Sequence, residues 1–217
     1  MDDISSLIKI FINFKVNLLV LLISFPLSYT MGFLLASLIF TLPKRPADIF
    51  FFGSYLVRSI PIVVQLVFFY FGFSTIGINL RPEFIAVFVF TIHYGAIFAE
   101  KFRSSFISVG QAVYDVGFTL GLRRIIVLKE IFFPQIFIQS FPAASNAIQG
   151  MIKDTAIISA ISIMDAITTA KSISSITFNF VWPFSVMYLC FLGSYVLLTL
   201  ILNTIQKNLD RRFGRSQ

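Results

Sequence analysis

The sequence predicts an all-α integral membrane protein with five transmembrane helices. Three observations support this prediction: the composition is strongly apolar, uncharged runs recur along the chain, and the basic residues are unevenly distributed between those runs. Apolar residues make up 57% of the 217 residues and charged residues 12%, whereas a soluble domain carries about 25% charged residues. A soluble fold of this size could not bury so much apolar surface.

The uncharged runs locate the spans, because about 20 apolar residues cross the hydrocarbon core as a helix. The first run is too long for a signal peptide and lacks a small-residue cleavage site, so we interpret it as a span. The fourth is interrupted by Pro142 and by the charged residues Lys153 and Asp154. The five expected spans cover residues 16–41, 57–78, 84–104, 137–164 and 184–206.

The basic residues indicate the orientation, since cytoplasmic loops carry an excess of Lys and Arg. With the N-terminus outside, twelve lie in cytoplasmic segments: Lys44, Arg45, Arg58, Lys101, Arg103, Arg123, Arg124, Lys129, Lys207, Arg211, Arg212 and Arg215. Four lie outside: Lys9, Lys15, Arg81 and Lys171. We therefore expect a periplasmic segment at 1–15, a membrane domain at 16–208 with a long cytoplasmic loop at 105–136, and a cytoplasmic tail at 209–217.

The net charge of +7 would suggest a nucleic-acid partner for a soluble protein. Here the positive-inside rule explains it, and we expect membrane lipid as a partner and no nucleic acid. The chain has no P-loop pattern, so we expect no ATP site in it. One histidine, His93, and one cysteine, Cys190, are too few for a catalytic triad or a metal site, so we expect neither catalysis nor a metal.

Charged residues within or beside the spans are the candidate pathway residues, because charge in a membrane is costly and usually faces a cavity or a partner. Adjacent residues point away from each other on a helix, so Lys153 and Asp154 should pair with different groups, either structurally or as part of a pathway. Glu100 ends the third span, as part of an interfacial cluster or as a gating residue. For His93 we favour a helix-packing hydrogen bond over a functional role.

The loop at 105–136 contains apolar residues at helical spacing, and Gly121 lies where a helix would end. The sequence thus predicts a short helix at about 112–120 near the membrane surface. With Asp115 on it and basic residues around it, such a helix suits docking into a groove of a partner protein. Lying on the membrane surface is the alternative.

Several motifs occur in one ungapped register. The first contains Arg58, Pro61, Gln65, Tyr70 and Gly72. The second contains Gly95, Ala96, Ala99, Glu100 and Arg103. The third contains Pro134, Gln135, Pro142, Asn146, Lys153, Asp154 and Thr155. In this register the chain resembles the permease subunits of binding-protein-dependent ABC importers for polar amino acids, the histidine, glutamine, arginine and opine group.

The resemblance extends to the cytoplasmic signature of that family, Glu-Ala-Ala-x-x-x-Gly. Here it would be formed by Asp115, Val116, Gly117 and Gly121, with a shorter acid and both alanines replaced. The resemblance implies that this segment is a coupling helix that rests on an ATPase subunit. Asp115, Gly117 and Gly121 are then the expected coupling residues.

The resemblance also implies the type I ABC importer permease fold in a bacterial inner membrane. Expected partners are a second permease subunit, in a homodimer or heterodimer, a cytoplasmic ATPase dimer that binds the ATP, and an extracytoplasmic substrate-binding protein. The permease would need no cofactor and would move substrate inward by alternating access. Glutamine is our best single guess for the substrate.

Two other function classes fit the sequence less well. A membrane enzyme would need clustered acid, base or metal-ligating groups, and the candidates His93, Glu100 and Asp154 are scattered along the chain. A small stand-alone oligomeric secondary transporter is the main alternative, although such transporters usually carry more spans and repeated halves. A copurifying soluble ATPase would separate the importer from both alternatives.

Overall fold

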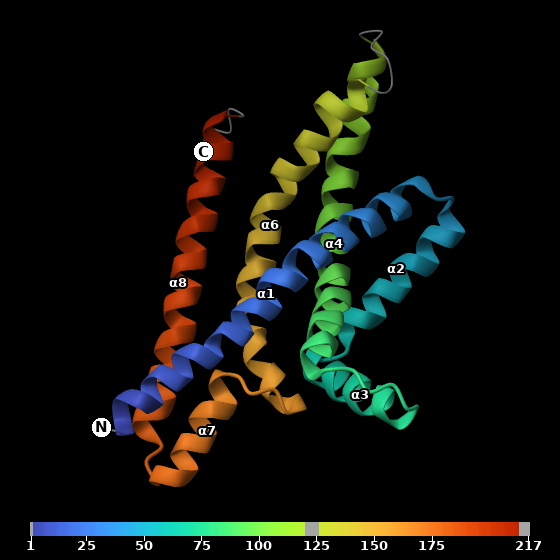
Figure 1. The fold of residues 1–217 in the computed structure, drawn as a ribbon. Helices are drawn as coiled ribbons and strands as arrows, with labels where there is room; N and C mark the ends of the chain where they lie inside the picture. Colours follow the sequence, from blue (N-terminus) through green and yellow to red (C-terminus); the bar gives the residue numbers. More distant parts are fainter. Residues whose placement is uncertain (1, 120–125, 213–217) are drawn as a thin grey trace.

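The structure is a computed structural model that describes residues 2–119 and 126–212, and within these ranges it contains helices and short connections but no strand. Figure 1 shows long helices that cross one another at several angles. In chain order the elements are α1 (Asp2–Thr41), α2 (Lys44–Ser59), α3 (Ile62–Thr75), α4 (Pro82–Thr119), η1 (Val127–Phe132), α6 (Phe133–Asp154), η2 (Thr155–Ile161), α7 (Ala166–Thr177) and α8 (Val181–Arg212).

The crossing of α1 over α4 forms the centre of the molecule (Figure 1). At the crossing Gly32 of α1 has no side chain to keep the helices apart. A Cβ atom built there would lie 2.5 Å from the Cβ atom of Phe98 and 2.9 Å from both the backbone nitrogen of Ala99 and the carbonyl oxygen of Gly95. Only glycine therefore permits this approach, which resembles the small-residue contacts typical of membrane helices.

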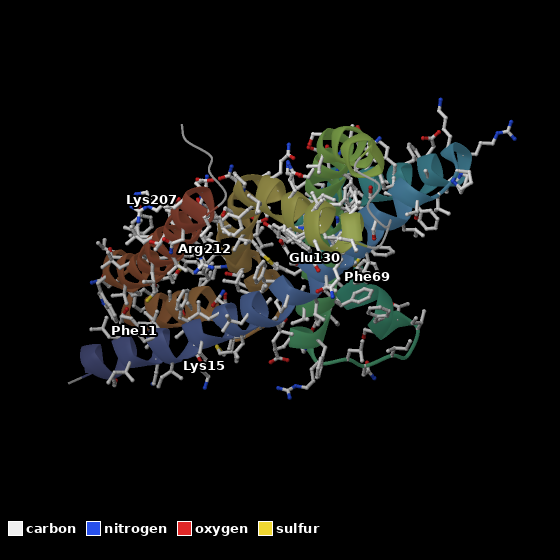
Figure 2. All side chains as sticks on the ribbon, turned by 90° about the horizontal axis from the view of Figure 1, so that it is seen from above. Phe11, Lys15, Phe69, Glu130, Lys207 and Arg212 are labelled. Atoms are coloured by element: carbon white, nitrogen blue, oxygen red, sulfur yellow. The ribbon has the colours of Figure 1, made fainter. Side chains whose placement is uncertain are left out.

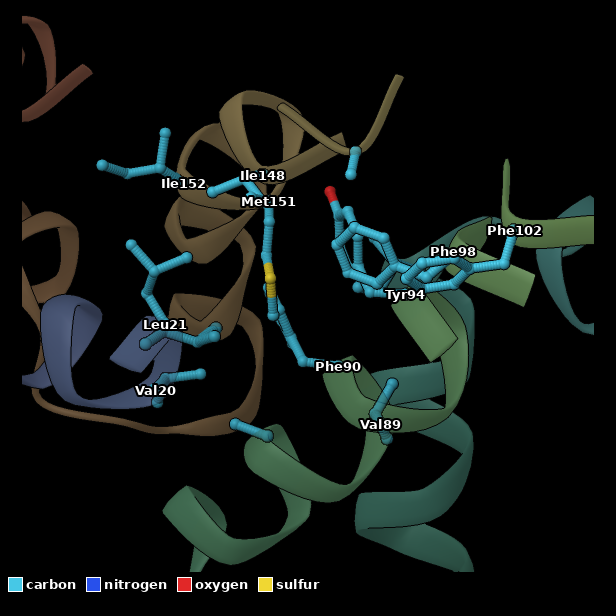
Figure 3. Close-up of a cluster of buried hydrophobic side chains, with 14 of the residues drawn as sticks. Val20, Leu21, Val89, Phe90, Tyr94, Phe98, Phe102, Ile148, Met151 and Ile152 are labelled. Atoms are coloured by element: carbon cyan, nitrogen blue, oxygen red, sulfur yellow. The ribbon is translucent and has the colours of Figure 1, made fainter. Parts of the chain in front are cut away.

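An aromatic ladder on α4 fills the space beside the crossing. Its members recur every four residues, so they lie on one face of the helix, and all are at most 3% exposed: Phe90, Tyr94, Phe98, Phe102 and Phe106. Tyr29 of α1 packs edge-on against Phe102 at a ring-centroid distance of 5.0 Å. Figure 3 shows part of the ladder beside Met151 and Ile148 of α6.

The predicted second span, 57–78, is broken in the structure. Ile60 is extended and Pro61 follows it, as expected because the residue before a proline disfavours the helical conformation. The chain turns by 94° between α2 and α3. Helix α2, which starts at Lys44, was not predicted, because its charged first turn ended the uncharged run.

The predicted fourth span, 137–164, is also several pieces. The π-helix η1 lies next to Pro134, which cannot donate to the carbonyl four residues before it. The α-helix α6 ends at Asp154, the tighter η2 follows, and Ser162 takes the left-handed conformation with φ of 60°. The bend to α7 is 54°. Helix α7 was missed, because its Ser- and Thr-rich sequence has neither a long apolar run nor a strong stripe.

The expected loop over 105–136 and the separate helix at 112–120 differ from the structure. Residues 105–119 continue α4 without a break, and η1 and the start of α6 return beside it (Figure 1). Within α4, the segment Pro82–Gly110 is long and apolar enough to cross a membrane. The last turns of α4 and η1 thus form a helical hairpin, which we call the α4–η1 hairpin. Gly121 lies outside the described residues.

Three helices of the described chain are long and apolar enough to cross a membrane, and up to five crossings result if each bent pair counts as one span. The first and last helices were expected at 16–41 and 184–206. Helix α1 begins earlier and α8 extends further. In Figure 1 the start of α1 and the end of α8 lie at opposite ends of the molecule. In Figure 2, the exposed Lys15 points outward from α1.

Candidate functional site

Lys153 and Asp154 lie at the joint between α6 and η2, and their side chains point to different helices as the sequence predicted. Asp154 accepts a hydrogen bond from the hydroxyl of Tyr94 on α4 at 2.7 Å. The ammonium of Lys153 lies over the ring of Tyr195 on α8, 4.4 Å from the centroid. Such a cation–π contact stabilises a lysine most where water is scarce. Tyr195 is held in turn by Gln149, to which its hydroxyl donates at 3.1 Å.

Beside Lys153 the structure has a pocket of about 240 Å³ between the α6/η2 joint, α7 and α8. Its other lining residues are apolar or aromatic: Ile152, Ala156, Ile167, Met187, Tyr188 and Phe191. Lys153 is exposed in the single chain, whereas Asp154 is half-buried. The pocket therefore offers one positive charge at the edge of an apolar surface, a combination that suits an amphipathic molecule with an anionic end.

Glu100 makes an ion pair with Arg58, which joins α4 to the end of α2. Arg103, one turn further along α4, lies over the ring of Phe51 at 4.3 Å. Two cationic contacts thus fix α2 along α4. The Arg58 and Glu100 side chains are 24% and 35% exposed, so the ion pair is only partly buried.

His93 and Gln65 meet inside the bend between α2 and α3. Both are 7% exposed, and the Gln65 Nε2 lies 3.0 Å from the His93 Nδ1. The same Nε2 donates to the carbonyl oxygens of Val57 at 2.6 Å and Ile60 at 2.9 Å. His93 of α4 thus contacts the Gln65 amide, and this amide in turn bonds to the carbonyls at the bend between α2 and α3.

A buried polar network at the start of α7 was not predicted. Asp165 is fully buried. It accepts from the backbone N–H of Thr168 at 2.8 Å and from Asn17 Nδ2 at 3.1 Å, and Asn17 also donates to the carbonyl of Thr155 at 2.9 Å. The first of these bonds caps α7, a role in which Asp is strongly preferred. The sequence signal was the isolated Asp165 after an apolar run, but it did not indicate the distant partner on α1.

Two of the expected coupling residues, Asp115 and Gly117, fall on the last turns of α4 in the α4–η1 hairpin. The third, Gly121, lies outside the described residues. Asp115 and Gly117 therefore lie on one helix, α4. Lys153 and Asp154 lie on another helix, at the end of α6. Across the described chain, no group of three or more His, Cys, Asp and Glu residues is arranged to hold a metal ion.

Comparison with known families and proteins gives a consistent result. The family described as binding-protein-dependent transport system inner membrane component matches residues 28–215. The L-cystine transport system permease protein TcyB of Bacillus subtilis (strain 168) is 29% identical over 159 residues, covering 73% of this chain and 67% of that protein. The putative glutamine transport system permease protein GlnP of Rickettsia bellii is 28% identical, covering 73% of both.

Solved structures share the fold. The structure of an amino acid ABC transporter with histidines superposes with a TM-score of 0.86 at 20% identity, covering 95% of this chain and 97% of that one. An inward-facing structure of the MetNI methionine ABC transporter gives a TM-score of 0.69 at 16% identity, covering 94% of both chains. The helix arrangement is therefore that of a type I ABC permease.

Proposed function

Because the chain belongs to the family of binding-protein-dependent transport system inner membrane components, we propose that it is the membrane-spanning permease subunit of an ATP-driven amino-acid importer. The observation that carries the proposal is the family match over residues 28–215, which includes every helix from the second half of α1 onward. Similar proteins are named as permeases for L-cystine, glutamine and arginine. Glutamine is the first substrate to test among polar amino acids.

In this proposal the chain does no bond chemistry. It pairs with a second permease subunit in a bacterial inner membrane, receives substrate from an extracytoplasmic binding protein, and moves it inward by alternating access. A cytoplasmic ATPase dimer binds the ATP and supplies the energy. Exposed apolar residues along α8 and α1, such as Leu197 and Leu22 at 61% and 66% exposure, suit contact with lipid or with the second subunit.

We place the substrate pathway beside Lys153 and Asp154. The Lys153 ammonium borders the pocket between η2, α7 and α8, where it can attract the carboxylate of an amino acid. Asp154 joins the same joint to α4 through Tyr94, and the ion pair between Glu100 and Arg58 joins α2 to α4. Both are contacts between helices that must shift during alternating access, so we assign them gating roles.

The pathway roles can be tested by substitution. Lys153→Met keeps the length of the side chain but removes its charge, so it should weaken uptake while leaving the protein assembled. Lys171→Met, which removes an exposed lysine from α7, is the matched control. Equal uptake by both variants would remove Lys153 from the pathway.

Coupling to the ATPase is assigned to the last turns of α4, which carry Asp115 and Gly117, and to Gly121. The Asp115→Lys variant should replace attraction with repulsion at the contact, and the Gly121→Val variant should be strained if the backbone there needs the freedom of glycine. Both proteins should remain in the membrane. Substrate-stimulated ATP hydrolysis and uptake, measured together after reconstitution, should both fall. Undiminished stimulation and uptake in both variants would show that coupling lies elsewhere.

The proposed orientation places the N-terminus and residues 1–15 outside and the tail at 209–217 in the cytoplasm. It rests on the uneven distribution of Lys and Arg and on the opposite positions of the start of α1 and the end of α8 in Figure 1. A reporter fused after Gln217 should be cytoplasmic, and one inserted between Asn79 and Glu83 should be outside. Both reporters on one side would contradict the five-span topology.

The decisive experiment for the function is purification from membranes of the native host through a C-terminal affinity tag, followed by reconstitution in proteoliposomes. We expect a soluble subunit with a Walker A motif to copurify, and uptake of a labelled polar amino acid to require both ATP and the binding protein. Uptake by the chain alone, driven by an ion gradient, would instead support a small oligomeric secondary transporter.

A further inference from the structure

The bend between α2 and α3 leaves two carbonyl groups in need of donors. The carbonyl of Val57 would normally accept from the backbone N–H four residues later, but that residue is Pro61. The N–H groups of Val64 and Gln65 both bond to the Pro61 carbonyl, at 3.0 and 3.2 Å. The carbonyl of Ile60 therefore also lacks its usual donor, the N–H of Val64. In an apolar environment an unpaired carbonyl is strongly unfavourable, because no water can bond to it.

The side chain of Gln65 supplies the missing donor to both carbonyls. Its Nε2 lies 2.6 Å from the Val57 oxygen and 2.9 Å from the Ile60 oxygen. The helix is broken at Pro61, four residues before Gln65. The Gln65 amide bonds back across this break to the carbonyls of Val57 and Ile60. Gln65 thus holds the corner at its 94° angle.

The contact with His93 restricts the protonation state of the imidazole. An amide nitrogen carries two hydrogens and donates only, whereas a ring nitrogen accepts only when it carries no proton. At 3.0 Å from the Gln65 Nε2, the His93 Nδ1 accepts only if it is unprotonated, with the ring proton on Nε2, and the two amide hydrogens are then shared among Nδ1 and the two carbonyl oxygens. An imidazolium carries N–H groups at both positions and does not fit this arrangement.

We propose that His93 and Gln65 form a proton-sensitive lock on the corner between α2 and α3. A proton taken up from water by Nδ1 places an N–H against the amide NH₂ group. The amide then rotates so that its oxygen accepts from Nδ1, and its NH₂ group leaves the carbonyls of Val57 and Ile60. With that donor gone the corner is free to open, so α3 changes its angle to α2 when His93 is protonated.

The surroundings leave room for this rotation. Gln65 lines an apolar cavity of about 330 Å³ with Val57, Ile60 and Phe68 among its neighbours, so the rotated amide has space to enter. The acidic side chain whose field reaches the imidazole is Asp154 of α6. From α2 the nearby charge is Arg58, which is paired with Glu100 of α4. Helix α3 contributes Tyr70 as its one ionisable side chain, and η2 contributes none.

The chain is well suited to a direct test, because His93 is its one histidine and Cys190 its one cysteine. Nitrogen-15 NMR of histidine-labelled protein in lipid nanodiscs reports the tautomer of His93 without overlap. We expect the form with the proton on Nε2 at neutral pH. A proton on Nδ1 under these conditions would overturn the proposal.

The corner itself can be followed by a distance between two spin labels. Phe52 of α2 and Phe71 of α3 are both 59% exposed, so cysteines can replace them in a Cys190→Ala background. As the pH is lowered from about 8 through the range in which NMR shows His93 taking up its proton, the distance distribution should shift together with that protonation. An unchanged distribution across that titration would also overturn the proposal.

Two variants separate the lock from general effects of pH. The His93→Asn variant keeps an acceptor beside Gln65 and cannot be protonated in this range, so its distance should stay constant. The Gln65→Leu variant removes the donor and should show the low-pH distance at every pH. A pH-dependent distance in His93→Asn would assign the change to another group. These measurements need no ATPase or substrate, so their outcome is independent of the importer assignment.

Discussion

The crossing of α1 over α4 and the corner between η2 and α7 are both buried, yet they are held together in different ways. At the crossing, Gly32 lets the two backbones meet and aromatic rings fill the space beside it. At the corner, Asn17 of the same helix α1 donates to Asp165 and to the carbonyl of Thr155. One region depends on shape and the other on hydrogen bonds.

The difference has a physical cause. In a bilayer, apolar burial alone gives little association, because lipid tails are as apolar as the side chains, and close packing or polar bonds must supply the stability. Where both helices are continuous, their backbone groups bond within the helix except beside Pro26 of α1, and close packing suffices. Where the chain is broken, as after Asp154, free backbone groups need partners. The polar residue Asn17 on a continuous helix provides them.

The largest effect is expected at the crossing. The Gly32→Leu variant would place a side chain where even a Cβ atom lies 2.9 Å from backbone atoms of α4, and backbone cannot move aside as a flexible side chain can. We expect destabilisation of about 3 kcal/mol or more, seen as loss of folded protein in detergent. The control is Gly193→Leu on α8, where nothing lies within 4 Å of the added Cβ. Equal yields of both variants would show that the crossing is not tight.

Substitutions at the corner between η2 and α7 should reduce stability less, because lost hydrogen bonds can be partly replaced. The Asp165→Ala variant removes the cap of α7 and leaves the Thr168 N–H and one Asn17 donor unpaired, at a cost of about 2 kcal/mol. The Asp165→Asn variant keeps an acceptor for Thr168 and should lose about half as much. Thermal unfolding in detergent would give both values. An Asp165→Ala protein as stable as the wild type would show that the network does not hold the corner.

The sequence predicted the parts of this comparison unevenly. The apolar runs predicted α1, the middle of α4 and α8, because these helices are continuous and a long uncharged stretch has few alternatives in a membrane protein. The breaks after Ile60 and Asp154 were not predicted, although Pro61 and the charged pair stand beside them. From sequence alone, an apolar run long enough to cross a bilayer is interpreted as one helix. A break within it is stable only if other residues bond to the freed backbone groups. Here these residues are Gln65 and Asn17, and their positions are known only from the structure.

The same reasoning applies to the candidate site. The opposite directions of Lys153 and Asp154 followed from helix geometry alone, and the contacts with Tyr195 and Tyr94 agree with it. The identity of those tyrosines depends on which helices pack together, and this was not readable from the sequence. Asp165 was not predicted as a site residue. Its role as a cap that binds α1 needs both the start of α7 and the position of Asn17.

The hydrogen bond between Tyr94 and Asp154 connects the crossing of α1 and α4 to the start of η2. Its removal should cause the third-largest loss of stability. The Tyr94→Phe variant keeps the ring in the aromatic ladder and removes one hydrogen bond to a carboxylate, which is worth about 1.5 kcal/mol. The matched control is Tyr188→Phe, since Tyr188 is 62% exposed. If both variants unfold at the same temperature as the wild type, the two regions are not joined through Asp154.

The smallest effect should come from thinning the aromatic ladder, and it measures how much of the crossing depends on ring packing. Phe102 is fully buried and contacts Tyr29 and Phe33 of α1. The Phe102→Leu variant keeps an apolar side chain of somewhat smaller volume, so it should cost about 1 kcal/mol. The control is Phe68→Leu on α3, because Phe68 is 68% exposed and should exchange one apolar surface for another at little cost. The difference between the two unfolding midpoints isolates packing from hydrophobicity, since both changes remove similar apolar area. If the two variants lose the same stability, ring packing contributes nothing specific at the crossing, and the contact at Gly32 holds α1 to α4 without it.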